Sequence, residues 1–527
     1  MKKIFTLFSA MLMSIASFAT TYNGTLTVTV NGEVSEQPTS VSIDEVNGNY
    51  KLSINNFMLV AGETPLPVGN IVIDHVPGAV NGGLTTLCTN QEIQIPAGNV
   101  EGIAEDEWLG PLLGNVPVEM NARFTGEGYV VTDIHINMVE LGQVIDVKFE
   151  NVGTHFQMPN SDFETWSDKN KAPKHWHGFE SVTGKLSGTA KSTTKLVSSN
   201  NVRPGSKGLT SAVVTSTKVV FVIANGTMTN GVLNAGSMSA ADASNHSETD
   251  LSSTSKDANG DPFATPMYAK PDSVKFWMRF TQAKAQASYP YAAFNAVITD
   301  GTYYQDPENK TYTNKVAVAA PNKADMTVGD WRLVSCPFDY ASYAANGAEA
   351  KAILLTVSTN ATPGKGSYSN GVADSVYVDD LELVYAAGIK SISFKGQALD
   401  LATIQTTGIE LAADEAVSAA DFEVVKEGED AKVTKLVEAT ADGYVAVITA
   451  VSADLKTQVA YEINIKKPAA PVLKGDINGD GVLDVADASA LIDMVLNSGT
   501  CTEVADVNGD GALDVADVTE LITLILG

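Results

Sequence analysis

The chain of 527 residues is strongly acidic, with a formal net charge of −28 at pH 7. This charge argues against nucleic acids and anionic membranes as partners, because both are bound by clustered Lys and Arg. The three cysteines, Cys88, Cys336 and Cys501, lie far apart and fit no zinc-site spacing, so no internal disulfide framework is expected. The length suits three to five domains of about 100–200 residues each.

The beginning of the chain has the order of a secretory signal. Lys2 and Lys3 precede a short apolar run, and Ser17 and Ala19 supply the small residues that signal peptidase requires. Residues 1–19 are therefore interpreted as a signal peptide of a secreted protein. No later apolar run reaches the roughly 18 residues of a membrane helix, so no transmembrane segment is expected.

Alternating apolar and polar residues predict many antiparallel strands between residues 20 and 155. Thr25–Val30 alternates and runs into Asn31-Gly32, and Asn47-Gly48 separates two further runs. Asn-Gly between alternating runs is a strong hairpin signal, because both residues tolerate positive φ. The phrases YNGTLTVTVNG, WLGPLLGNVPVEMNARF and IDVKFE resemble the calycin-like β-barrel domain of secreted Bacteroidetes proteins. The resemblance implies a closed barrel of about eight strands, filled by side chains or holding one small ligand.

A second β region is expected over residues 157–387. It opens with Asn160–Trp166 and closes with Ser375–Tyr385. These phrases resemble the two ends of a carbohydrate-metabolism domain family of Bacteroidetes. They also resemble jelly-roll carbohydrate-binding modules, in which the first and last strands lie side by side. The resemblance places Glu164 and Asp379 where related jelly rolls hold a structural Ca²⁺.

The aromatic residues of this region favour carbohydrate binding, because aromatic rings stack on the apolar faces of sugars. Trp166 and Trp176 are expected in the core. The candidates for an exposed platform are Tyr289, Tyr291, Tyr303 and Tyr304.

Residues 388–467 form a third, smaller β pattern. Tyr444–Thr449 and Tyr461–Ile465 alternate strictly, which predicts an Ig-like β-sandwich that acts as a spacer. Pro468 and Pro471 then predict a semi-extended linker at 468–473.

Residues 474–527 contain one pattern twice, offset by 30 residues: DINGDGVLDVADASALIDMVL and DVNGDGALDVADVTELITLIL. Each copy supplies oxygen donors at positions 1, 3, 5, 7, 9 and 12 of a loop, with glycine at position 6 for a sharp turn. The first set is Asp476, Asn478, Asp480, the Val482 carbonyl, Asp484 and Asp487. The second set is Asp506, Asn508, Asp510, the Ala512 carbonyl, Asp514 and Asp517.

Calcium is the cation that these loops favour. Ca²⁺ takes six to eight oxygen ligands, and converging carboxylates repel one another without a cation. Two Ca²⁺ ions are therefore expected, in a module that is poorly ordered without them. Position 12 is Asp rather than the Glu of a full EF-hand, and the prolines leave no helix before the first loop. Each half is thus a loop followed by one helix.

Two such loop-helix halves resemble the type I dockerins. The resemblance implies a cohesin-domain protein as partner and contact through loop positions 10 and 11, which are Val485, Ala486, Val515 and Ala516. The near identity of the halves suggests binding in two orientations related by a half turn. An apolar stripe is expected on each helix, formed by Leu491, Ile492, Val495 and Leu496 and by Leu521, Ile522, Ile525 and Leu526.

No catalytic motif identifies an enzyme, since HExxH, GxSxG, Walker and GxGxxG sequences are not found. A glycosidase pair of carboxylates cannot be selected among 62 acidic residues, so no catalytic residue is assigned. His175 and His177 are expected to be exposed loop residues rather than a metal pair.

The expected fold class is mainly β and multidomain. It combines a calycin-like β-barrel, a jelly-roll β-sandwich, an Ig-like β-sandwich and a small all-α calcium-binding dockerin. The expected function is polysaccharide handling by non-catalytic glycan-binding modules that the dockerin brings to a cohesin-bearing partner. The alternatives are a glycoside hydrolase site within residues 158–387 and a barrel that binds a small apolar ligand.

Overall fold

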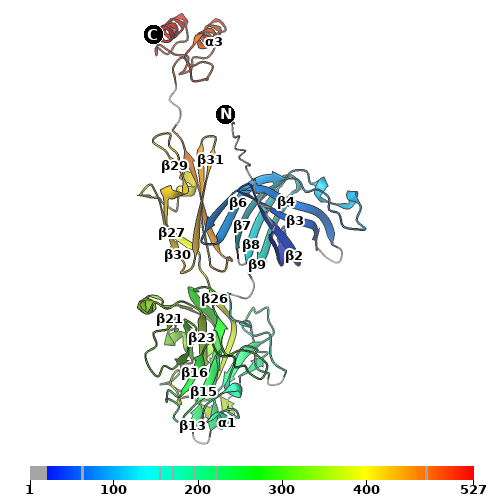
Figure 1. Ribbon diagram of the computed structural model, residues 1–527, viewed down its shortest axis with the longest axis vertical. Helices are drawn as coiled ribbons and strands as arrows, with labels where there is room; N and C mark the ends of the chain where they lie inside the picture. Colours follow the sequence, from blue (N-terminus) through cyan, green and yellow to red (C-terminus); the bar gives the residue numbers. More distant parts are fainter. Residues whose placement is uncertain are drawn as a thin grey trace, which may run out of the picture. The chain divides into compact units, whose positions relative to one another are not determined.

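The structure is a computed structural model and describes residues 20–60, 65–126, 128–152, 156–168, 171–193, 196–219, 222–468 and 473–527 (Figure 1). The signal peptide predicted at residues 1–19 lies outside the described residues, as does most of the predicted linker. Contacts divide the chain into two compact units. One comprises the described residues up to 405 with 418–437 and 446–462, and the other comprises 406–417, 438–445 and 463–527. Within the described part of the chain, no helix has the length and apolar character needed to span a membrane.

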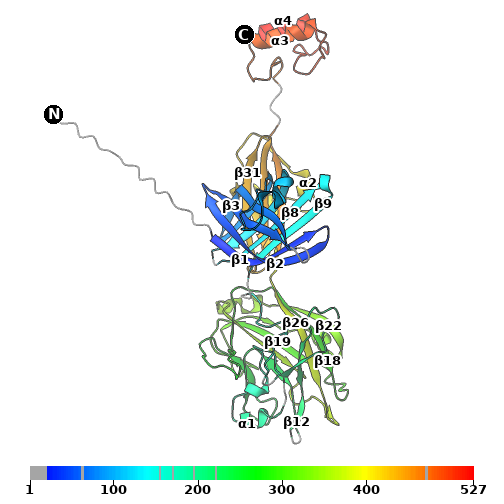
Figure 2. The ribbon, with the colours of Figure 1, turned by 90° about the vertical axis from the view of Figure 1, so that its right-hand side faces the viewer.

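The first sheet has nine antiparallel strands and is strongly curled (Figures 1 and 2). They are β1 (Thr20–Val30), β2 (Glu33–Val46), β3 (Asn49–Leu59), β4 (Leu66–Val76), β5 (Gly78–Asn81), β6 (Leu84–Ile93), β7 (Val116–Thr125), β8 (Val130–Met138) and β9 (Gln143–Asn151). Their order is β4-β3-β2-β1-β9-β8-β7-β6-β5, so β4 and β5 are the edges. Only Pro77 separates these two edge strands, and proline has no N–H for the ladder. Counted as one interrupted strand, β4 and β5 bring the number of strands to the eight expected.

Both predicted Asn-Gly turns are confirmed. Asn31 and Gly32 join β1 to β2 with φ of 49° and 93°, and Asn47 and Gly48 join β2 to β3 with φ of 53° and 82°. The alternating residues of the strands supply a continuous apolar cluster on one face of the curled sheet. Its members include Leu26, Leu52, Ile73, Met120 and Phe149.

Two five-stranded sheets form a β-sandwich between residues 156 and 385. The first has the order β10 (Leu196–Ser199), β11 (Ser211–Thr215), β26 (Ser375–Val384), β18 (Ser273–Thr281) and β22 (Gly329–Pro337). The second has the order β14 (Thr227–Thr229), β23 (Ala352–Ser358), β19 (Ala293–Thr299) and β21 (Lys315–Ala319), and β17 (Thr265–Pro266) pairs with β23. The two sheets share one apolar core, in which the rings of Phe276 and Phe294 stack with centroids 4.1 Å apart.

Smaller elements border this sandwich. A three-stranded sheet contains β15 (Val232–Ala235), β16 (Asn245–Thr249) and β20 (Tyr304–Asp306), and two hairpins are β12 (Thr217–Val219) with β13 (Val222–Ala224) and β24 (Tyr368–Ser369) with β25 (Val372–Ala373). Helix α1 spans Ser187–Ala190. The 3₁₀ helices of the chain are η1 (Glu105–Glu107), η2 (Gly110–Leu112), η3 (Val139–Leu141), η4 (Phe179–Ser181), η5 (Lys323–Met326), η6 (Ala341–Asn346) and η7 (Ala419–Asp421).

The opening segment of the sandwich lies beside its last strand, as predicted. The Leu381 amide donates to the Ser161 carbonyl at 2.8 Å, and the Gln157 side chain exchanges hydrogen bonds with the backbone of Leu383. Trp176 is buried, as expected. The prediction that Trp166 is a core residue is wrong, because it forms an isolated backbone bridge with Pro173 at the surface and is 36% exposed.

Two further small sheets follow. One has the order β28 (Gln397–Ala398), β27 (Gly388–Phe394) and β30 (Phe422–Glu427). The other has the order β29 (Ile409–Glu410), β33 (Gln458–Lys466), β32 (Gly443–Val451) and β31 (Lys432–Thr440), with helix α2 at Ile404–Thr407. The predicted alternating runs Tyr444–Thr449 and Tyr461–Ile465 lie in β32 and β33, and the Ig-like sandwich stays a prediction.

The C-terminal helices, α3 (Val485–Leu496) and α4 (Val515–Leu526), lie side by side (Figure 2). Leu491 and Leu521 are fully buried in a small cluster of apolar residues from both halves. The predicted stripes are only partly buried, since Ile492 and Leu496 are exposed, as are their counterparts on α4. Adjacent helical residues point about 100° apart, so a single narrow contact covers only part of each stripe.

Candidate functional site

The first C-terminal loop is folded around the carboxylate of Asp476. Its Oδ1 accepts hydrogen bonds from the amides of Gly479 and Asp480 at 2.8 and 3.1 Å, and its Oδ2 accepts from Gly481 at 2.9 Å. Gly481 has a φ of 82°, which permits the sharp turn at position 6. The backbone amides of the loop are therefore sufficient to orient the Asp476 carboxylate.

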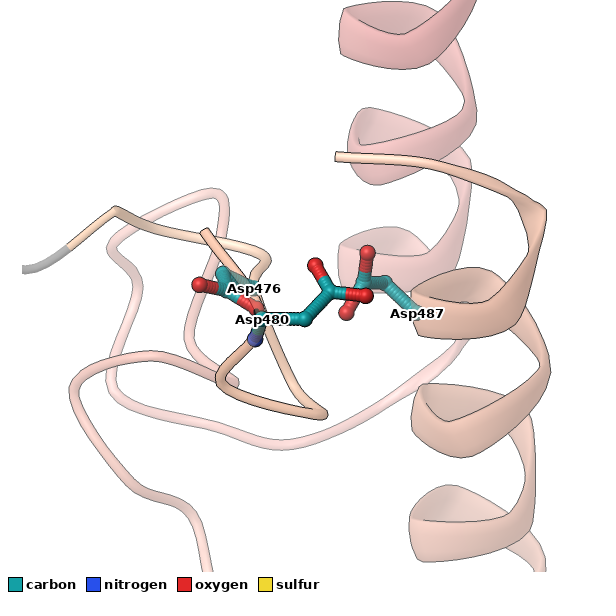
Figure 3. A group of neighbouring side chains, drawn as sticks. All are labelled: Asp476, Asp480 and Asp487. Carbon is teal, nitrogen blue, oxygen red and sulfur yellow. Dashed lines mark hydrogen bonds between the residues drawn. The ribbon is translucent and has the colours of Figure 1, made fainter. Parts of the chain in front are cut away.

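Asp487 closes the loop from the first turn of α3. Its side chain is fully buried and accepts from the amides of Asn478 at 3.1 Å and Asp484 at 3.0 Å. Burial opposes ionisation of this carboxyl, but the backbone donors outweigh it and hold the pKa of Asp487 below its ordinary value. The side chain reaches back from the helix toward the loop that carries Asp476 and Asp480 (Figure 3).

Three carboxylates of the first loop converge. Oxygen atoms of Asp476, Asp480 and Asp487 all lie within 4.8 Å of one another. Such an all-oxygen set suits a hard cation, and without one the three charges repel. The residues present therefore fit Ca²⁺, with Asn478 and the Val482 carbonyl available beside them. Asp484 also caps α3, since its Oδ1 accepts from the Ala486 amide at 2.7 Å.

The second loop repeats this framework. Asp517 is buried and accepts from the amides of Asn508 at 3.2 Å and Asp514 at 3.0 Å. Within the described residues, the close approach of three carboxylates occurs in the first loop alone. In the second loop, Oδ1 of Asp506 is instead a buried acceptor without a hydrogen-bond partner. A buried acceptor without a donor is costly, and a bound cation would satisfy it.

The predicted partner-contact residues lie at the first turns of α3 and α4. All four are exposed, with Val485 at 72% and Val515 at 68%. Exposed apolar side chains at the first turns of both helices suit a docking surface.

The four predicted platform tyrosines do not form one surface. Tyr304 is only 2% exposed and packs with Val297, Leu354 and Tyr312, so its proposed exposure is wrong. Tyr303 is 39% exposed, and its hydroxyl donates to Glu248 at 2.8 Å.

Tyr289 and Tyr291 lie before β19, whereas Tyr303 lies after it. The seven residues of this strand span about 20 Å, which separates the two groups. Ammonium groups also lie over the first two rings, that of Lys365 at 5.7 Å from Tyr289 and that of Lys323 at 6.0 Å from Tyr291. One face of each ring is therefore covered.

Glu164 and Asp379, the predicted structural calcium ligands, have different environments. The Glu164 carboxylate accepts from the amides of Leu209 at 3.0 Å and Thr210 at 2.9 Å. Asp379 is fully buried; Oδ2 accepts from the Arg203 amide at 3.0 Å, and Oδ1 has no hydrogen-bond partner. The unmatched oxygen of Asp379 is thus the feature that favours a cation here.

We expect Asp379→Asn to stabilise the sandwich in the presence of a chelator at pH 7.5. Burial raises the pKa of Asp379 to about 6. The hydrogen bond from the Arg203 amide acts to lower this pKa, whereas the Asp380 charge acts to raise it. The unfolded carboxyl ionises near pH 4, so the native chain loses stability as the pH rises from about 4 to about 6. The variant should lack this loss and melt roughly 2–4 °C higher at pH 7.5, measured by tryptophan fluorescence.

Adding Ca²⁺ shows whether the Asp379 carboxylate is a cation ligand or a buried group without a ligand. A cation on Asp379 would raise the melting temperature of the native sandwich but not that of Asp379→Asn. An identical pH profile for the two chains in chelator would contradict the assignment of the raised pKa. Asp380→Asn is the matched control, since that neighbour is partly exposed and paired with Arg203.

His177 is buried, and its predicted exposure is therefore wrong. Its backbone pairs with Thr229, and its Nε2 lies 3.1 Å from the Pro262 carbonyl. Burial lowers the pKa of His177 and favours the neutral ring. His175 is more exposed, with Nδ1 3.6 Å from Asp261.

The sandwich also contains a cavity of about 450 Å³ that sequence reasoning missed. It is lined by residues of β14, β19 and β23, by the sheet β15-β16-β20, and by the region around α1. Its residues come from segments between Phe179 and Gly364, and no motif of adjacent residues marks them.

Comparison with protein families identifies a domain toward each end of the chain. Residues 18–152 match the calycin-like β-barrel domain, and residues 474–526 match the dockerin type I domain. The chain thus carries a calycin-like barrel domain toward its N-terminus and a type I dockerin at its C-terminal end. Dockerin type I domains bind calcium, and they occur on extracellular proteins that assemble through cohesins.

Similarity to other proteins is distant. A comparison with curated proteins finds no match. Among solved structures, a Bacteroides fragilis protein shares 9% identity with a TM-score of 0.17, covering 64% of this chain and 96% of that one.

Two other solved structures contain carbohydrate-binding modules. The M60 catalytic domain with two CBM51 domains of Clostridium perfringens ZmpB shares 11% identity, with a TM-score of 0.14, over 85% of this chain and 40% of that one. The CBM22 tandem of Paenibacillus barcinonensis Xyn10C shares 11% identity, with a TM-score of 0.19, over 70% of this chain and 97% of that one. Similarities this weak establish no shared fold.

Proposed function

We propose that the chain is a secreted assembly protein whose dockerin attaches it, with bound Ca²⁺, to a cohesin-bearing partner. The observation that carries this proposal is the first C-terminal loop. There Asp476, Asp480 and Asp487 converge within 4.8 Å directly beside the exposed Val485 and Ala486. The ion would thereby set the orientation of the helix that presents these two side chains.

The dockerin would bring the β domains to this partner, and their proposed role is non-catalytic glycan binding. The cavity in the sandwich, lined by aliphatic and polar side chains, supports binding within residues 157–387. The alternative of a barrel that binds an apolar ligand is less favoured, because apolar side chains such as Leu26, Met120 and Phe149 fill the core of the curled sheet. A glycoside hydrolase site in residues 158–387 remains the enzymatic alternative, and release of reducing sugar from polysaccharide would establish it.

The test of attachment is capture from a cell-surface extract by the full chain, with and without Ca²⁺. We expect Ca²⁺-dependent capture of a protein that contains a cohesin domain, identified by mass spectrometry. Equal capture in excess chelator would contradict the calcium-dependent mechanism.

The two exposed valines allow a test of binding in two orientations. Because either half could supply the contact, Val485→Asp and Val515→Asp should each weaken cohesin binding by no more than about fivefold. The double variant should weaken it by about 100-fold or more, since it places a charge in both copies of the apolar surface. Val80→Asp is the matched control, because Val80 is equally exposed on the curled sheet. Loss of binding in one single variant alone would show that only one half docks.

A further inference from the structure

The cavity of the β-sandwich lies on the sheet face that points away from the apolar core. On β23, Leu355 and Val357 belong to the core, whereas Thr356 and Ser358 line the cavity. On β19, Phe294 belongs to the core, whereas Ala293 and Asn295 line the cavity. This alternation follows from the two-residue period of a strand. The volume of about 450 Å³ lies within the range of about 300–1,000 Å³ typical of small-molecule sites.

The charge of the lining disfavours an anionic ligand. Among the described residues that line the cavity there is no Lys or Arg, and the titratable groups are Asp306 and His246. Both His246 nitrogens lie 2.9 Å from acceptors, Nδ1 from the Ala243 carbonyl and Nε2 from the Glu248 carboxylate. The imidazole is thus committed within the protein, and Asp306 is the charged group left to face a ligand.

The remaining polar groups are amides and hydroxyls held in fixed positions. Asn295 Nδ2 donates to Asp306 Oδ2 at 3.0 Å, which orients the carboxyl. Asn225 Nδ2 donates to the Ser358 hydroxyl at 3.2 Å and to the Asn360 carbonyl at 3.0 Å. Asp306 is an acceptor, and burial raises its pKa, so a ligand group that donates a neutral hydrogen bond suits it. An ammonium group fits less well, because burying an ion pair carries a large desolvation cost.

The apolar part of the lining is aliphatic. Leu186, Val222, Leu233 and Met238 contribute, and among the described lining residues Phe179 is the one aromatic hydrocarbon. A flat polysaccharide chain stacked on several aromatic rings does not match this surface. A compact ligand with hydroxyl groups and aliphatic C–H faces does.

We propose that this cavity binds a short neutral saccharide, a mono- or disaccharide or the end of a chain, with a hydroxyl donated to Asp306. The proposal rests on the glycan-binding role proposed above and narrows it. The ligand is uncharged and small, and it binds in the cavity on the face of β19 and β23 that points away from the core, rather than on the surface tyrosines.

The test uses the full chain in Ca²⁺ and a panel of defined probes. Saturation-transfer NMR and calorimetry would compare neutral mono- and disaccharides with a uronic-acid disaccharide and with hexylamine. We expect at least one neutral sugar to bind, and the uronic acid and the amine to bind at least about tenfold more weakly. Preferential binding of the amine or of the uronic acid would overturn the assignment of ligand class.

Three variants locate the site. Ala293→Leu fills the cavity and should weaken sugar binding by at least about tenfold. Asn295→Ala removes the group that orients Asp306 and should weaken sugar binding severalfold. This second variant keeps the test valid if Ala293→Leu unfolds. Tyr303→Ala, the control on the surface, should bind the sugar normally. Loss with Tyr303→Ala and normal binding by both cavity variants would overturn the proposal.

Two further results separate this proposal from the broader one. Polysaccharide binding on a glycan array without binding of any small neutral sugar would overturn the cavity assignment and leave the glycan role standing. No glycan binding of any kind would overturn both, while cohesin capture in the same preparation would still support the dockerin function.

Discussion

Chelation of Ca²⁺ is expected to unfold residues 474–527 while the β-sheets stay folded. In the first loop, backbone amides hold carboxylates in positions where they face one another, as Asp476 and Asp487 show. The second loop repeats the amide contacts at Asp517. Removing the cation restores their mutual repulsion, and the small apolar core around Leu491 and Leu521 has little stability to oppose it. Helices of twelve residues are marginal without such packing.

Hydrogen exchange measured by mass spectrometry would show this selectivity. With excess chelator, amides of α3 and α4 should lose protection by roughly 100-fold or more, equivalent to about 2.7 kcal/mol. Restoring Ca²⁺ should restore protection, whereas Mg²⁺ should not, because Mg²⁺ demands a tighter octahedral site. Unchanged protection of both helices in chelator would refute the proposed coupling of calcium binding and folding.

Substitutions assign this effect to each loop. Asp476→Ala should remove the calcium dependence of α3, and Asp506→Ala that of α4, with the double variant unfolded at any Ca²⁺ concentration. Asp493→Ala is the matched control, because Asp493 is an exposed carboxylate on α3 outside the loop. A similar loss of protection in the control would show that overall charge, rather than ligation, sets stability.

The features that sequence predicts well are local. Each proposed calcium loop takes its candidate ligands from twelve consecutive residues, so the spacing in the sequence predicts the cluster that contains Asp476 and Asp487. The hairpin turns at Asn31-Gly32 and Asn47-Gly48 depend on two adjacent residues with positive φ. In these cases the chemistry of neighbours in the chain determines the structure.

The features that sequence misses depend on tertiary contacts. Tyr304 and Tyr303 are adjacent and chemically identical, yet one is buried and the other is partly exposed. The fully buried His177 is covered by strands and loops far along the chain, including Thr229 and Pro262. The cavity combines segments nearly 200 residues apart, and no local pattern can show that their side chains surround one space.

Leu491→Ala is expected to destabilise the dockerin by about 2–5 kcal/mol, even with Ca²⁺ present. Leu491 is fully buried in a cluster of six buried residues, so its truncation leaves a cavity that so small a core cannot fill. Leu521→Ala removes the symmetric contact and should have a similar cost. The matched control is Ile492→Ala, because Ile492 is the next residue on the same helix and is 40% exposed, which predicts a cost below about 1 kcal/mol.

Calcium titration followed by circular dichroism of the helices would measure these costs. Because calcium binds the folded module, destabilisation raises the Ca²⁺ concentration at the midpoint, by about tenfold for each 1.4 kcal/mol when one ion is linked to folding. Leu491→Ala should therefore shift the midpoint by roughly 30-fold or more, and Ile492→Ala by less than about fivefold. Equal shifts for the two variants would mean that α3 packs through a different face. In that case Ile492 would contribute to the core as much as Leu491 does, and less of the helix surface beside Val485 would be exposed.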